Sequence, residues 1–138
     1  MDRDQVQNAL AGFFAARVQN RPEDVLEKFA QGACVRMAGA SEASPIAHSA
    51  QTKDELHDSI FGLVSIWQWH DIEILATVIE DNTAAVRYQI KTTHVPTGSE
   101  QISESMDQFY FDESGKIIEL IEFVDTALVA QIEKTATG

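Results

Sequence analysis

The sequence predicts an α+β fold, in which helices pack on one face of a curved antiparallel sheet. Two observations support this class. Segments before residue 70 have mainly the apolar spacing of helices, whereas the segments after residue 70 alternate apolar and polar residues and are joined by short, turn-rich connections. A run of helices followed by a run of strands is typical of α+β proteins.

Three helices are expected in the first half of the chain. Residues 4–19 form an amphipathic pattern, with polar residues opposite an apolar face made by Val6, Leu10, Phe13, Phe14 and Val18. Pro22 suits the first turn of a second, shorter helix, which Gly32 is expected to end. Thr52 and Glu55 have the spacing of a capping box and open the third and longest helix. Its apolar residues at helical spacing are Leu56, Ile60, Leu63, Val64 and Trp67.

The strands are expected mostly in the second half. Residues 33–39 predict a short first strand, and residues 38–50 predict a loop that contains Pro45. Four longer strands then follow as a meander, separated by turn-forming residues. They are expected over residues 70–81, 84–95, 101–111 and 116–124. Asp125 is a suitable N-cap for a last helix over residues 126–134.

Composition limits the class of protein. A chain of 138 residues is long enough for one domain with a real core, so we expect a single domain over residues 1–138. The net charge is −12, and such a surface repels phosphate backbones, so no nucleic-acid partner is expected. No apolar run approaches the roughly 20 residues that a membrane span requires. The N-terminal residues do not have the pattern of a secretory signal, which makes a cytoplasmic location the expectation.

Cysteine, histidine and glycine patterns argue against a bound metal or cofactor. Cys34 is the one cysteine, so an intrachain disulfide is excluded. None of the histidines lies at ligand spacing from another, which makes a metal site unexpected. These histidines are His48, His57, His70 and His94. The chain has no glycine-rich loop of the phosphate-binding kind, so no organic cofactor is expected.

The most unusual residue of the predicted meander is Asp107. Alternation along the strand over residues 101–111 places Asp107 on the same face as Phe109 and Phe111. An ionised carboxylate on an apolar face is costly. Two interpretations remain open: the face lies at the rim of the sheet, where the acid reaches water, or Asp107 lies in a cavity with a raised pKa, as a general acid or base requires.

The element order, together with the segment MDQFYFDESGKIIELIEFVD over residues 106–125, resembles the nuclear transport factor 2-like superfamily. This group includes ketosteroid isomerases, limonene epoxide hydrolases and SnoaL-like polyketide cyclases. The resemblance covers nearly the whole chain. It implies a SnoaL-like domain with a cone-shaped, curved sheet (a cystatin-like roll), helices on the concave face and a deep apolar pocket. It also implies a homodimer formed through the outer face of the sheet.

Two activities of the superfamily match this sequence only in part. In ketosteroid isomerases the pattern Asp-x-Phe-x-Phe places an acid in the pocket, and Asp107 begins that pattern here. The phenol expected from the first helix is missing, since Phe13 and Phe14 occupy that region. The expected general-base aspartate is also missing, since Arg36 and Met37 stand near the end of the first strand.

Limonene epoxide hydrolases carry Arg-x-Asp on the third meander strand and an acid on the fourth. Here Ser105 replaces the arginine, and Glu122 occupies the place of the second acid. Arg36 is a candidate for the absent positive charge. Each face of the last strand carries one glutamate, so periodicity does not decide whether Glu122 points inward. A salt bridge from Glu122 to Arg36 or Arg87 is the structural alternative.

The resemblance therefore implies a small-molecule enzyme or enzyme-like protein that binds an apolar or amphipathic ligand. Its chemistry would be proton transfer of the isomerase, cyclase or hydrolase type, with Asp107 and Glu122 as the catalytic acids. The pocket is expected to be lined by Phe14, Arg36, Trp67, Phe109, Phe111, Leu120 and Val124. The alternative function is a non-catalytic ligand-binding or protein-interaction module on the same fold, which the missing phenol, base and arginine favour.

Overall fold

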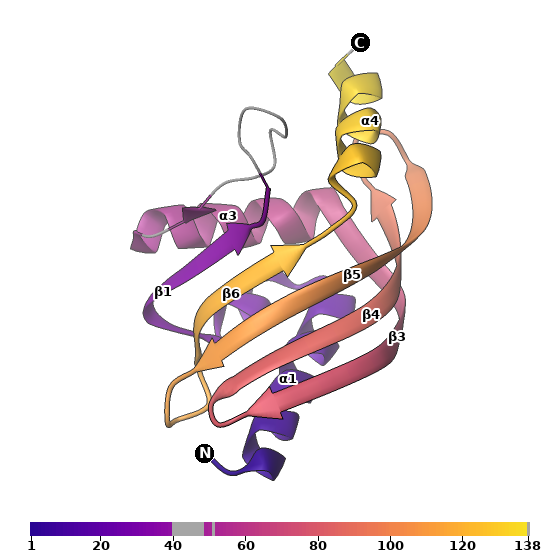
Figure 1. Ribbon diagram of the computed structural model, residues 1–138. Coiled ribbons are helices and arrows are strands. Elements are labelled where there is room, and N and C mark those ends of the chain that lie inside the picture. The colour runs from indigo at the N-terminus through magenta and orange to yellow at the C-terminus, as the bar shows by residue number, and fades with distance from the viewer. Residues whose placement is uncertain (40–48, 51, 138) are drawn as a thin grey trace.

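The computed structural model describes residues 1–39, 49–50 and 52–137, and within them the chain forms four helices and six strands (Figure 1). The helices are α1 (Arg3–Val18), α2 (Pro22–Leu26), α3 (Lys53–Ile66) and α4 (Thr126–Thr137). The strands are β1 (Phe29–Met37), β2 (Ser49–Ala50), β3 (Trp67–Glu80), β4 (Thr83–His94), β5 (Ser99–Phe111) and β6 (Ile117–Phe123). The predicted α+β class and the four-strand meander are confirmed. Most of the predicted loop over residues 38–50, including Pro45 and His48, lies outside the described residues.

The sheet is a curved layer with the strand order β2-β1-β6-β5-β4-β3. The meander β3 to β6 is antiparallel, as predicted, but β1 pairs with β6 in parallel. Figure 1 shows these two strands side by side with their arrowheads pointing the same way. The sheet as a whole is therefore mixed, because the last strand of the meander returns alongside a strand that precedes α3.

Helix α1 lies across one face of the sheet and builds the core there (Figure 1). The Asp2 side chain accepts a hydrogen bond from the Gln5 backbone N–H at 2.8 Å, so the helix begins with a capping box. Phe13 and Phe14 pack edge-to-face against Phe109, with ring centroids 5.2 and 5.9 Å apart. Aromatic pairs in this geometry add about 0.5–1.5 kcal/mol beyond their buried area. The aromatic part of the inner face is therefore filled by α1.

The second helix and the first strand differ from their predicted bounds. Helix α2 ends at Leu26, and Gly32 does not stop it, because Gly32 lies inside β1. Gly32 has φ +81°, a conformation that residues with a side chain rarely adopt. The pairing of β1 with β6 shifts between Phe29 and Cys34. The glycine thus allows a bulge in a longer strand. A glycine at a bulge cannot be told from a glycine at a helix end by the local sequence alone.

A second break in register explains why the faces of β6 could not be read from alternation. Phe111 pairs with Ile117, whereas the next pair joins Tyr110 to Glu119. The extra residue on β6 is a bulge, which lets Ile117 and Leu120 both point to the core. From Leu120 onward the strand alternates regularly, and Glu122 falls on the inner face.

Asn20 joins the end of α1 to the start of β3. Its φ is +57°, its Oδ1 accepts a hydrogen bond from the Trp69 N–H at 2.9 Å, and its Nδ2 donates to the Trp69 carbonyl at 2.9 Å. We expect Asn20→Ala to lower the free energy of unfolding by about 2–4 kcal/mol, because the side-chain hydrogen bonds are lost and alanine must adopt a left-handed conformation. Asn20→Gly, which keeps the backbone conformation accessible, should cost less. Urea unfolding measures both, and equal losses would contradict the conformational part.

Within the described residues, no helix is long and apolar enough to cross a membrane.

Candidate functional site

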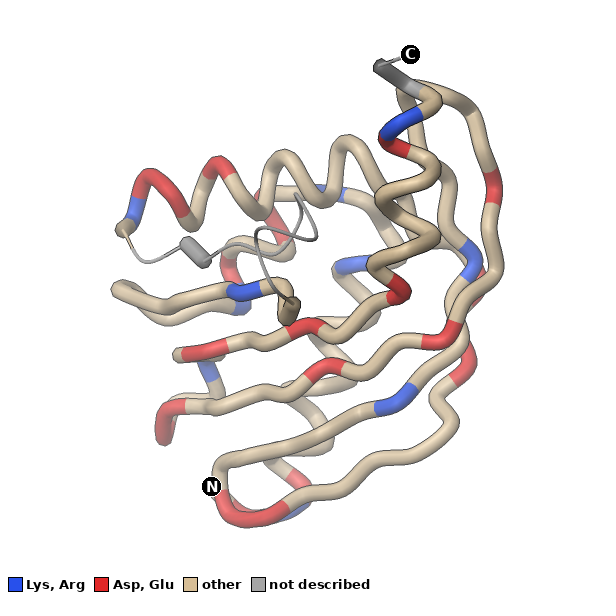
Figure 2. The backbone as a smooth tube through the Cα atoms, turned by 45° about the horizontal axis from the view of Figure 1, so that its top comes forward, with Lys and Arg blue, Asp and Glu red and all other residues tan. Residues whose placement is uncertain are grey.

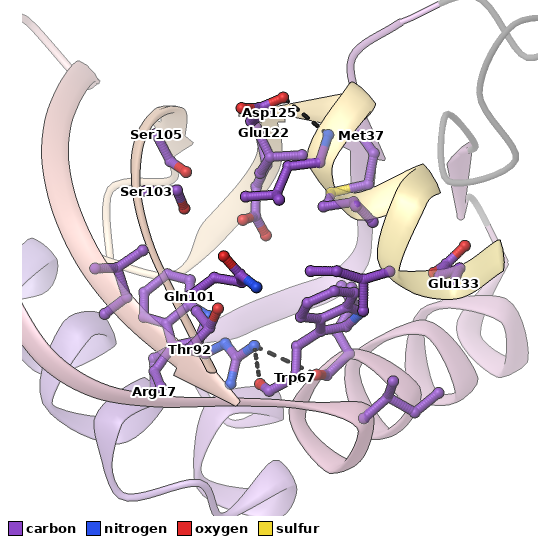
Figure 3. Close-up of a pocket in the computed structure, with 18 of the residues that line it drawn as sticks. Arg17, Met37, Trp67, Thr92, Gln101, Ser103, Ser105, Glu122, Asp125 and Glu133 are labelled. Atoms are coloured by element: carbon purple, nitrogen blue, oxygen red, sulfur yellow. Dashed lines mark hydrogen bonds between the residues drawn. The ribbon is translucent and has the colours of Figure 1, made fainter. Parts of the chain in front are cut away.

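A cavity of about 450 Å³ lies between α3, α4 and the inner face of the sheet (Figure 3). This volume is within the range of small-molecule sites. The helices supply an apolar wall that includes Leu63, Ile66, Leu128, Val129 and Ile132. The strands supply a polar wall that includes Thr92, Gln101, Ser103, Ser105 and Glu122. The strands also supply apolar side chains, among them Met37, Trp69 and Ile90, so the cavity is amphipathic, with a mixed strand side and a mainly apolar helix side.

Asp107 and Glu122 are directly opposed residues of β5 and β6. Asp107 is 0% exposed and Glu122 is 8% exposed. Glu122 lines the cavity, and Figure 3 shows its carboxylate pointing from β6 into it. Asp107 is not among the lining residues, so it lies behind Glu122 rather than beside the ligand space. One acid of the pair therefore faces the cavity, and the other lies behind it.

Burial and mutual repulsion separate the roles of these two acids. Burial, followed by the nearby Glu122 carboxylate, raises the pKa of Asp107 well above its ordinary value. Burial also raises the pKa of Glu122, but Arg17 opposes that increase. Asp107 Oδ2 has no hydrogen-bond donor among the described residues, which further disfavours its ionised form. When the pair holds a single proton, that proton therefore lies on Asp107 and the negative charge lies on Glu122.

Tyr88 of β4 completes the polar floor of the cavity. Its hydroxyl donates a hydrogen bond to Asp107 Oδ1 at 3.0 Å, and the residue lines the cavity. Burial, followed by the charge of Asp107, raises the pKa of Tyr88 well above its ordinary value, so the phenol stays a neutral donor. A phenol is thus present in the site, but it comes from a strand and not from the first helix, where the resemblance placed it.

Arg17 supplies the positive charge of the site from the last turn of α1. Its Nη2 donates hydrogen bonds to the carbonyls of Trp67 at 2.8 Å and Leu63 at 3.3 Å, and its guanidinium lies 4.4 Å from the Trp69 ring centroid. Burial lowers the pKa of Arg17 to about 10, against the opposing effect of Glu122, so the group is cationic at neutral pH. The sequence analysis missed this residue. Its spacing of three residues from Phe14 could have revealed it, since that spacing places it on the buried face of the helix.

The structure brings together only some of the predicted site residues. Glu122, Trp67 and Val124 line the cavity. Four predicted pocket residues are instead buried in the core, on the part of the inner face that α1 covers: Phe14, Phe109, Phe111 and Leu120. None of the four lines this cavity, because alternation indicates which face of the sheet a residue occupies but not how far along that face the cavity extends.

Arg36 does not line the cavity, and the interpretation of it as a pocket cation is wrong. It is exposed on β1 and lies opposite Ile121, on the other face of the sheet from Glu122. Arg87 pairs with Glu104 on that same outer face, so it is not the partner of Glu122 either. Arg17 is the cation whose charge acts on Glu122.

Metal ligands and histidines add nothing to the site. No group of three or more His, Cys, Asp or Glu side chains suited to a metal ion occurs in the described part of the chain. His94 is buried, its ring Nδ1 lies 2.9 Å from the Thr97 hydroxyl, and its ring packs on Trp67 with centroids 4.6 Å apart. It is therefore a satisfied structural histidine.

The raised pKa of Asp107 predicts a pH dependence of stability. The folded state holds this proton to a higher pH than the unfolded state, so stability falls as pH rises from about 4 through the folded pKa. Asp107→Asn removes this loss while keeping an acceptor for Tyr88. We expect the variant to lose less stability than the wild type between pH 5 and pH 8 in urea titrations. Asp71→Asn, at an exposed aspartate, is the control, and parallel pH curves for wild type and Asp107→Asn would contradict the assignment.

Comparison with known proteins places the fold. No family model matches the sequence, and no curated protein matches it. Among solved structures, an NTF2-like protein from Burkholderia thailandensis is 22% identical, with a TM-score of 0.70 over 92% of this chain and 95% of that chain. The epoxide hydrolase/cyclase-like enzyme SalBIII, associated with pyran ring formation in the polyether salinomycin, is 14% identical, with a TM-score of 0.73 over 91% and 95%. The pinacolase BvnE from Penicillium brevicompactum is 12% identical, with a TM-score of 0.77 over 96% and 94%. The chain therefore has the nuclear transport factor 2-like fold, as its resemblance implied.

Proposed function

We propose that this protein is a small-molecule enzyme that moves a proton on an amphipathic substrate, with Glu122 as the group that takes and returns the proton. The observation that carries the proposal is the buried pair of Asp107 and Glu122, of which one member opens into a cavity of ligand size. Carboxylates with strongly perturbed pKa values in clefts are candidates for catalysis. The charged member faces the cavity, as a general base must.

The neighbours of Glu122 fit this role. Arg17 opposes the rise that burial causes in the pKa of Glu122, and it provides a positive charge in the cavity lining that would stabilise negative charge developing on the substrate. Asp107 accepts a hydrogen bond from the Tyr88 hydroxyl at 3.0 Å. Because a protonated Asp107 carries no charge, it raises the pKa of Glu122 less than an ionised carboxylate in the same place would. The site thus contains a base, a cation and a phenol around one end of an amphipathic cavity.

The same set of groups serves several reactions. Glu122 removes a proton from a carbon or from a water molecule, the electron pair stays on the atom that lost the proton, and the proton is returned to a different atom. Isomerisation, cyclisation and hydration share this step. Two proteins of the same fold are an epoxide hydrolase/cyclase-like enzyme and a pinacolase.

The test uses two simple probes in D₂O. Exchange of the α-protons of 4-phenylcyclohexanone, followed by ¹H NMR, reports carbon deprotonation, and hydrolysis of 1-phenylcyclohexene oxide reports water activation. We expect the protein to accelerate at least one reaction over buffer, with a rate that rises as Glu122 ionises. Binding of both probes in the cavity without acceleration of either reaction would instead support the non-catalytic binding module.

We also propose that the chain forms a homodimer through the outer face of the sheet. Ile102 and Phe123 alternate with cavity residues, point outward and are 66% and 49% exposed. Exposed apolar residues gathered on one face are typical of protein interfaces. Phe123→Lys is expected to give a monomer in analytical ultracentrifugation, whereas Val95→Lys, at an apolar residue of similar exposure outside the sheet, should not. A wild type that sediments as a monomer would refute the proposal.

A further inference from the structure

The polarity of β5 is inverted in the part of the strand that borders the cavity. Ser103 and Ser105 point to the inner face and line the cavity, whereas Ile102 and Met106, which flank the two serines, point outward and are 66% and 40% exposed. Glu104, between the serines, also points outward. A sheet with one covered face normally places apolar residues inward and polar residues outward. Further along the same strand Phe109 follows the normal rule. The inversion is therefore local to the cavity.

The two serine hydroxyls have no hydrogen-bond partner among the described residues. Ser105 is only 7% exposed, and Figure 3 shows both side chains turned toward the cavity. Neither hydroxyl oxygen is among the buried side-chain atoms that lack a partner, so both face open space in the cavity. Their hydrogen-bonding capacity is therefore available to an oxygen or hydroxyl of a ligand.

The serines form a row that leads to the proposed base. Ser105 pairs with Tyr88 across β4, and the next inward residue of β5 is Asp107, opposite Glu122. Inward residues of a strand are spaced about 6.7 Å apart. Ser103 therefore lies about 13 Å along the strand from the level of the acid pair. At the far end of the row, Thr92 pairs with Gln101 and both line the cavity.

The charges around the cavity favour a neutral ligand. Four carboxylate residues are among those that line it: Asp58, Glu122, Asp125 and Glu133. Arg17 is the one basic residue in the described lining, and its charge already acts on Glu122. The whole chain has a net charge of −12, and Figure 2 shows acidic residues spread over the helices and strands. An anionic ligand would meet repulsion here.

We infer that the substrate is a neutral amphipathic molecule with hydroxyl, ether or carbonyl oxygens along one edge, and that Ser103 and Ser105 bind those oxygens at a distance from the reacting atom. Its apolar edge packs on α3 and α4. This inference rests on the proposed function for the identity of the reacting end, but the serine row itself is a specificity site that can be tested by binding alone.

The experiment measures dissociation constants for three probes by ¹H–¹⁵N NMR titration. The probes are phenylcyclohexane, trans-4-phenylcyclohexanol and 4-cyclohexylbenzoate. The variants are Ser103→Ala, Ser105→Ala and the double variant, with Ser65→Ala, an exposed serine of α3, as the matched control. We expect each cavity substitution to weaken binding of the alcohol about fivefold, the equivalent of one hydrogen bond of about 1 kcal/mol, and to leave the hydrocarbon unchanged or more tightly bound. Ser65→Ala should change neither constant.

Three outcomes would overturn the inference: an alcohol affinity unchanged in the double variant, equal weakening of the alcohol and the hydrocarbon, or tighter binding of the benzoate than of the alcohol. Thermal unfolding of each variant checks that the fold is kept. Because binding is measured and Glu122 is left intact, failure of the serine row does not depend on catalysis. Loss of proton transfer in a Glu122 variant would still support the proposed function in that case.

Discussion

Glu122→Gln is expected to lower the rate of catalysed proton transfer at least about a hundredfold, because a positioned general base contributes about 10²–10⁴-fold. Glutamine keeps the size and hydrogen-bonding capacity of the side chain but cannot accept a proton at neutral pH. The measurement is the initial rate with the ketone or epoxide probe that the wild type turns over. The dissociation constant of that probe should change much less than the rate.

Glu119→Gln provides the matched control on the same strand. Glu119 pairs with Tyr110 and Cys34, does not line the cavity, and should retain the wild-type rate. Retention of more than about a tenth of the activity by Glu122→Gln would contradict its role as the base. So would an equal loss of activity in the Glu119 variant, since that would indicate a general effect on the strand.

Arg17→Met is expected to lower the free energy of unfolding by about 2–4 kcal/mol, because the buried guanidinium donates two charge-assisted hydrogen bonds that methionine cannot replace. The substitution leaves a buried Glu122 without its cation and leaves the carbonyls of Leu63 and Trp67 without a donor. A loss of this size is a large part of the total stability of an ordinary domain. Urea unfolding at pH 7 measures it.

A double-mutant cycle separates the charge effect from the packing effect. Arg17→Met combined with Glu122→Gln should be more stable than the sum of the single losses predicts, because no buried charge is then left unpaired. Arg3→Met, at an exposed residue of the same helix, should be close to the wild type. A loss below about 1 kcal/mol for Arg17→Met, or full additivity in the cycle, would show that the two groups are not coupled.

Patterns along the chain predicted the fold well because the fold follows local signals. Thr52 accepts a hydrogen bond from the Glu55 N–H at 3.1 Å and begins α3, and Asp125 accepts one from the Leu128 N–H at 3.0 Å and begins α4. These caps were predicted from spacing alone. The parallel pairing of β1 with β6 was not, because nothing in either strand specifies which edge of the sheet the other will join.

Only those site residues that strand alternation or the family resemblance identifies were predicted from the sequence. Asp107 was found because a charge on an aromatic face is conspicuous in the sequence. Arg17 was missed, since it reads as an ordinary polar residue of an amphipathic helix until the fold brings Glu122 near it. The sequence analysis did not identify Tyr88, because its hydrogen bond to Asp107 depends on the register of β4 against β5.

The ionisable residues of the site, Arg17, Asp107 and Glu122, lie far apart along the chain, and this separation has a consequence for the order of folding. Arg17 lies near the beginning of the chain, whereas its counterion Glu122 lies in the last strand, and β1 can pair with β6 only when that strand exists. During synthesis the N-terminal helices leave the ribosome well before either acid. The meander from β3 to β5 is local and can form first, because contacts close in sequence cost little loop-closure entropy. Helix α1 is therefore expected to dock only after the meander has formed, because its contacts with β3 and with Phe109 of β5 join residues far apart in sequence.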